Sequence, residues 1–195
     1  MNLSQVVVPK NKSVLVLSNF RSGSTALCNV LGKHLNKQNL DEDLYINQEA
    51  DQTVLDTSRK GVIFKVQPDH VPETLWKDIL DNCFVIGITR RNVVDQIASF
   101  HVCTLTEQWH NNADYKLYDN KKIHSIVLDD VEIRKNVAYI LETREKYSQN
   151  KHLLDIEFYY EDIKTELTES DYSISTRPDN YADLQKHISK ILYGE

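Results

Sequence analysis

The stretch SVLVLSNFRSGST, residues 13–25, contains the transition that decides the fold. Residues 13–18 are mostly valine and leucine, a composition that favours a buried β-strand. Apolar side chains then recur at helical spacing from Leu27 to Leu35, so we expect a helix after a short polar loop. A strand that leads through a loop into a helix is the building unit of an α/β sheet.

The same unit recurs along the chain. Apolar runs predict three further strands, at residues 61–66, 83–89 and 153–158. Apolar periodicity predicts further helices, starting at Pro72 and over about 93–106, 129–147 and 179–192. Strands that are apolar on both faces and alternate with helices indicate a three-layer α/β fold, in which helices flank a mostly parallel sheet. The polar segments 36–60 and 111–128 are expected to form loops.

Length and composition predict one compact domain over residues 1–195, with 41% hydrophobic side chains. The net charge of −6 disfavours binding of nucleic acid along the whole surface, so an anion site has to be local. No apolar run approaches the ~18 residues of a membrane span, and the first residues lack the character of a signal peptide. Three cysteines in core-like settings argue against a disulfide framework. We therefore expect a cytoplasmic protein with no membrane partner.

The loop after the first strand has the features of an anion site. Backbone N–H groups of the loop and of the following helix terminus converge there. Gly23 permits a tight turn, Arg21 supplies a permanent charge, and hydroxyl donors follow. These hydroxyls belong to Ser22, Ser24 and Thr25. The Walker A spacing GxxxxGK[ST] is absent, which disfavours a nucleoside triphosphate kinase or a GTPase. The alternative is an ordinary helix start capped by Ser24.

A second basic loop follows the strand predicted at residues 83–89. It contains Arg91, and the next helix carries Ser99 eight residues further on. This spacing would allow the serine to face the same side as the arginine. Taken alone, an arginine in a loop is most often a solvated surface charge, and a helical serine is usually a packing contact.

Together, the two loops resemble those of the sulfotransferases that use 3′-phosphoadenosine 5′-phosphosulfate (PAPS). In that family a loop such as RSGS or KSGT holds the 5′-phosphosulfate, and here residues 21–25 read RSGST. An arginine at the end of a later strand, with a serine eight residues on, holds the 3′-phosphate, and Arg91 and Ser99 have that spacing. Residues 158–164, FYYEDIK, resemble the family's late strand ending in YEDL. The three motifs occur in the family's order.

The arginine in the first loop makes the chain more similar to the carbohydrate and bacterial-type branch. In this branch a glutamate after the first helix often serves as the base, which implies Glu49 as the leading candidate. The cytosolic branch uses a histidine two residues after a lysine, where this chain has Gln67 after Lys65. Because glutamine cannot accept a proton at neutral pH, His70 is the substitute candidate. The simpler alternatives are a solvated loop acid for Glu49 and a helix cap for His70.

The resemblance implies a fold like that of the P-loop NTPases and transfer of a sulfuryl group from PAPS to a hydroxyl or amine acceptor, with PAP as product and no metal. Cofactor contacts are implied for residues 21–25, Arg91 and Ser99, and Arg177 would replace a basic loop that this chain lacks. Arg21 and Lys65 would meet the charge on the departing phosphate. The implied partner is a small-molecule or carbohydrate acceptor. Since the usual family domain is longer, a homo-oligomer could complete the cleft.

Two other functions fit the same residues. A nucleotide-binding relic would keep both phosphate loops without a base, and Gln67 keeps this alternative open. A small-molecule kinase with a degenerate phosphate loop would instead prefer ATP bound to Mg²⁺. Separate titrations of PAP, ATP and Mg²⁺ distinguish the three.

Overall fold

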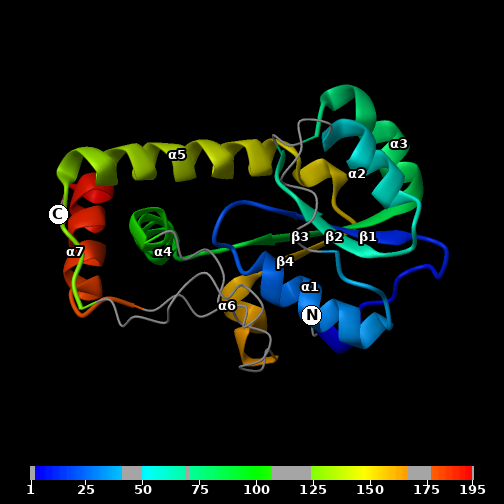
Figure 1. The fold of residues 1–195 in the computed structure, drawn as a ribbon, viewed down its shortest axis with the longest axis horizontal. Coiled ribbons are helices and arrows are strands. Elements are labelled where there is room, and N and C mark those ends of the chain that lie inside the picture. The colour runs from blue at the N-terminus through cyan, green and yellow to red at the C-terminus, as the bar shows by residue number, and fades with distance from the viewer. Residues whose placement is uncertain (1–2, 41–49, 69–70, 107–123, 167–176, 195) are drawn as a thin grey trace.

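The computed structural model describes residues 3–40, 50–68, 71–106, 124–166 and 177–194, without the side chains of 50–53. Four strands form one sheet in the order β2-β1-β3-β4, and each neighbouring pair is parallel. The strands are β1 (Ser13–Ser18), β2 (Ile63–Val66), β3 (Cys83–Thr89) and β4 (Ile156–Tyr159). Because the strands run in the same direction, their carboxyl ends lie at one edge of the sheet (Figure 1). Ligands bind beyond this edge in open parallel sheets.

Helices cover both faces of this sheet (Figure 1). One face carries α1 (Ser24–Leu35), and the other carries α2 (Ala50–Ser58) and α3 (Trp76–Asn82). The remaining helices are α4 (Val93–Thr106), α5 (Asp130–Gln149), α6 (Tyr160–Ile163) and α7 (Tyr181–Tyr193). Short 3-10 turns lie at Leu3–Gln5, Glu73–Leu75, Lys151–Leu153 and Lys164–Glu166.

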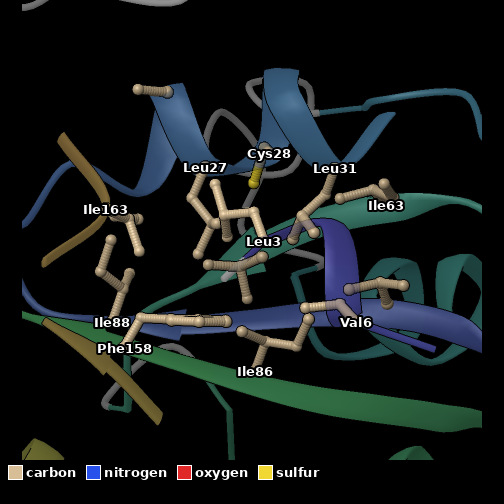
Figure 2. Close-up of a cluster of buried hydrophobic side chains, with 13 residues drawn as sticks. Leu3, Val6, Leu27, Cys28, Leu31, Ile63, Ile86, Ile88, Phe158 and Ile163 are labelled. Atoms are coloured by element: carbon tan, nitrogen blue, oxygen red, sulfur yellow. The ribbon is translucent and has the colours of Figure 1, made fainter. Parts of the chain in front are cut away.

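Strand alternation determines which side chains reach each face. In β1, Val14 and Val16 belong to the core beneath α1, whereas Leu15 and Leu17 belong to the core with α2 and α3. Figure 2 shows the first of these cores, which combines side chains from all four strands, α1 and the amino-terminal turn. Because both faces are covered, every residue of β1 is buried.

A third core lies to one side of the sheet (Figure 1). It joins α4, α5 and α7 through buried apolar side chains that include Ile97, Ile140 and Leu184. The long helix α5 extends from these helices to the sheet, where Tyr147 is buried in the core with α2 and α3. The helix α5 thereby contributes to both the third core and the core of the sheet.

The structure confirms the α/β class with a parallel sheet flanked by helices, and it corrects two details. The segment 36–60, expected to be a loop, contains α2, whose Val54 and Leu55 are buried against the sheet. The last strand begins at Ile156, because residues 151–153 form a 3-10 turn after α5. The four described strands are all parallel, which agrees with the expected, mostly parallel sheet.

The three cysteines are buried and form no disulfide, as predicted. Burial raises the pKa of the Cys83 thiol to about 12.

Candidate functional site

The loop between β1 and α1 brings backbone N–H groups to the edge of the sheet. Arg21 and Gly23 have positive φ values of 55° and 89°. This conformation is uncommon for a residue with a side chain, and such strain is concentrated at functional sites. Gly23 is the N-cap of α1, and a glycine has no side chain with which to cap the helix. The alternative of a cap by Ser24 is therefore wrong, and the first N–H groups of α1 can bind an anion.

Gly23 is required by a contact as well as by its conformation. A Cβ atom at this position would overlap the ring of Tyr160, the first residue of α6. The same ring has the guanidinium carbon of Arg90 at 4.3 Å from its centroid. Tyr160 therefore packs against both basic loops.

Strand β2 directs a buried lysine toward the first turn of α1. Ile63 belongs to the core beneath α1, and Lys65, two residues on, lies on the same side of the sheet. Its Nζ donates a hydrogen bond to Oγ1 of Thr25 at 2.7 Å, although only 7% of the residue is exposed. The structure thus brings together two of the predicted site residues and holds a buried amine beside the loop.

Arg21 and Ser99 meet although 78 positions separate them in the sequence. The Nε atom of Arg21 donates a hydrogen bond to Oγ of Ser99 at 3.0 Å. Ser22 is fully buried, and its Oγ finds no hydrogen-bond partner in the described part of the chain. A buried polar atom without a partner costs about 1–3 kcal/mol. The loop therefore contains a hydroxyl that a ligand oxygen would satisfy.

A buried polar network supports the loop from behind. Gln96 of α4 donates through Nε2 to Oδ1 of Asn19 at 3.0 Å, and its Oε1 accepts from Nη1 of Arg144 at 2.6 Å. Asn19 also donates to Oγ1 of Thr89 at 3.4 Å. The sequence-based prediction missed these residues. The sequence contained an indication for two of them. Gln96 and Arg144 are polar residues at helical spacing from the buried apolar residues of their helices, which indicates a position on the buried face.

The arginines of the second loop are paired with carboxylates. Nη1 of Arg90 lies 2.8 Å from Oδ2 of Asp95, and burial lowers the pKa of Arg90 despite this carboxylate. Arg91 binds Asp162 through both guanidinium Nη atoms, one at 2.7 Å, and this hydrogen bonding lowers the pKa of Asp162. Oγ of Ser99, which was predicted to share a ligand with Arg91, accepts a hydrogen bond from Arg21.

Two further contacts hold the second loop. The guanidinium carbon of Arg91 lies 4.0 Å from the ring centroid of Tyr159. The carboxylate oxygens of Glu161 accept hydrogen bonds from the backbone N–H groups of Arg91 and Asn92, each at 3.1 Å. Burial by itself would raise the pKa of Glu161, but these hydrogen bonds lower it overall. The segment after β4, which resembled a family motif, is therefore the structural partner of the second loop.

Asp95 joins the carboxyl-terminal helix to the second loop. Its Oδ1 accepts hydrogen bonds from the Tyr181 hydroxyl at 3.0 Å and from Nε2 of Gln185 at 3.1 Å. Nη2 of Arg177 lies 3.4 Å from the same oxygen, and its guanidinium carbon lies 4.8 Å from the ring centroid of Tyr181. The structure thus places Arg177 next to Asp95, the ion-pair partner of Arg90, although Arg177 and Asp95 are 82 positions apart in the sequence.

Both candidates for the base, Glu49 and His70, lie outside the described residues. Gln67, where the cytosolic branch has its histidine, is 5% exposed. Its Oε1 has no hydrogen-bond partner among the described residues.

No family model, curated protein or solved structure matches this chain. In the described ranges, no helix combines the length and the apolar character needed to cross a membrane. The same ranges contain no cluster of three or more histidine, cysteine or carboxylate side chains that could hold a metal ion.

Proposed function

We propose that this chain is a PAPS-dependent sulfotransferase with a P-loop-like fold, acting on a hydroxyl or amine acceptor. The observation that carries the proposal is the first loop. Its buried Ser22 hydroxyl has no partner in the described chain, and it adjoins a helix N-terminus whose N-cap, Gly23, has no side chain. Arg21 and Lys65 place two basic groups at the same loop. Such an arrangement suits a phosphate or a phosphosulfate.

The proposed reaction is an in-line transfer. PAPS supplies the sulfuryl group: the S–O bond to the 5′-phosphate breaks while a bond from sulfur to the acceptor oxygen or nitrogen forms. Arg21 and the first N–H groups of α1 would bind the 5′-phosphate, and Lys65 would stabilise the negative charge that grows on it. Thr25 would orient the ammonium group of Lys65 through their hydrogen bond of 2.7 Å.

A base has to take the proton of the acceptor, and Glu49 is the leading candidate. Loss of a general base typically slows turnover about 10²- to 10⁴-fold with little effect on cofactor binding. Glu49→Gln is therefore expected to lower kcat on that scale at unchanged PAP affinity. His70→Ala is expected to cost less than about tenfold. The reverse ranking would move the role to His70, and two active variants would exclude both.

Calorimetric titration of the whole chain with PAP, 5′-AMP, and ATP with and without Mg²⁺ tests the proposal. We expect PAP to bind more tightly than 5′-AMP, and its binding to need no Mg²⁺. PAP at 100 times its Kd should stabilise the fold by about 2.7 kcal/mol in thermal unfolding. A preference for ATP with Mg²⁺ would indicate a kinase. PAP binding without transfer from PAPS to a panel of small-molecule and carbohydrate acceptors would indicate a nucleotide-binding protein without catalysis.

A further inference from the structure

The segment YYED, which includes the last residue of β4, contacts both basic loops. Tyr160 packs on Gly23 of the first loop. Glu161 accepts two backbone N–H groups of the second loop, and Asp162 binds both Nη atoms of Arg91. An acidic segment of the chain itself thus engages the donors of the second loop.

The pair between Arg91 and Asp162 is more exposed than the other arginine pair of this loop. The two side chains are 52% and 50% exposed, against 12% and 18% for Arg90 and Asp95. Exposed ion pairs are weak, because water and salt screen them. A phosphate uses the same bidentate geometry toward a guanidinium and carries more charge than a carboxylate. A ligand phosphate can therefore compete for Arg91, whereas the ion pair of Arg90 is better shielded from water.

We propose that Asp162 is a specificity-determining residue, which competes with a ligand's 3′-phosphate for Arg91 and so limits the preference for PAP over 5′-AMP. This inference rests on the proposed function, since it requires a nucleotide whose 5′-phosphate binds the first loop. The competitor is part of the same chain, so it acts at every ligand concentration. The apparent affinity for PAP is therefore the intrinsic affinity multiplied by the fraction of molecules in which the pair between Arg91 and Asp162 is broken.

Calorimetry with PAP and 5′-AMP on the full chain tests this inference. Asp162→Asn is expected to raise the PAP affinity about two- to fivefold, the range for release of an exposed pair. The affinity for 5′-AMP should stay within about twofold. In an Arg91→Ala background, Asp162→Asn should no longer change the PAP affinity, which a double-mutant cycle measures directly.

The matched control is Asp130→Asn on α5, which changes the net charge equally. Asp130 is 51% exposed and pairs with Arg134 of its own helix at 2.7 Å and with His187 of α7 at 2.9 Å, so neither partner belongs to the two basic loops. This variant should leave the ratio of PAP to 5′-AMP affinity unchanged.

Two results would overturn the role of Asp162 and leave the proposed function intact. The first is that PAP binds tightly, but the ratio of the PAP affinity to the 5′-AMP affinity is the same in the wild type and in a folded Asp162→Asn variant. The other is an equal gain in Asp130→Asn, which would assign the effect to net charge. Failure of the wild-type chain to bind either nucleotide would overturn the proposed function and this inference with it.

Discussion

The loops after β1 and β3 lie at the same edge of one sheet and both contain arginine, yet their surroundings differ. In the first loop, the arginine and the nearby lysine hydrogen-bond to hydroxyl groups. In the second, each of the two arginines faces a carboxylate. The N-cap of the helix after the first loop is a glycine, which has no side chain to cap it, whereas Glu161 binds the backbone N–H groups of the second loop.

The comparison shows that an arginine in a loop does not by itself make an anion site. A ligand at the second loop has to displace a carboxylate, and that displacement reduces its net gain in free energy. At the first loop, the helix N-terminus has a glycine as its N-cap, so an anion there displaces no side chain of the cap residue. We therefore expect the first loop to supply most of the affinity and the second to adjust selectivity.

The largest effect is expected from Gly23→Ala, which would break the first loop. The added Cβ meets the Tyr160 ring, and the φ of 89° strains any other residue. We expect the free energy of unfolding to fall by about 2–4 kcal/mol, together with loss of nucleotide binding. Denaturant unfolding and calorimetry measure the two effects.

Gly61→Ala is the matched control for Gly23→Ala. Gly61 has a φ of 70°, but a Cβ there would meet nothing within 4 Å. Its replacement should therefore cost only the conformational strain, about 1–2 kcal/mol. Equal losses in the two variants would show that the contact between Gly23 and Tyr160 is unimportant.

The next largest effects are expected from replacing one arginine in each loop, which distinguishes the contributions of the two loops to nucleotide binding. Arg21→Ala should weaken PAP and 5′-AMP alike by about 10- to 150-fold, equivalent to about 1.5–3 kcal/mol for a charge-assisted bond. Arg21→Lys should retain part of the affinity. Arg91→Ala should weaken PAP and leave 5′-AMP nearly unchanged, because only PAP has the 3′-phosphate. Calorimetry on the folded variants checks this, and equal weakening of both nucleotides by Arg91→Ala would remove the selectivity role from the second loop.

The smallest effect is expected on the free energy of unfolding at low pH. Protonation of the carboxylates that bind the second loop should cause it. Hydrogen bonds lower the pKa of Asp162 below its ordinary 3.8, and they lower the pKa of Glu161 below 4.5 although burial opposes them. Such a carboxylate stabilises the fold above its ordinary pKa and loses that contribution as the pH falls through its folded pKa. Urea unfolding from about pH 5 to about pH 2 should therefore show a steeper loss for wild type than for the Glu161→Gln, Asp162→Asn double variant. Parallel curves would contradict the coupling of these carboxylates to the second loop.

Local patterns were sufficient for most of the fold. The strand at residues 83–89 and the helix at 93–106 were predicted with their observed bounds, since strand and helix periodicities are visible within a few residues. The helix α2 was missed because it lies in a polar segment in which few residues mark an apolar face. Short helices of this kind owe most of their stability to packing, here of Val54 and Leu55 against the sheet.

The sequence by itself determined where the two basic loops lie, because parallel strands that alternate with helices bring their carboxyl ends to one edge. Only the tertiary structure decided what each loop binds within the chain. Arg91 pairs with Asp162, 71 positions later, and Arg21 with Ser99, 78 positions later. Such partners depend on how distant segments pack, so the spacing of eight residues between Arg91 and Ser99 carried no information about them.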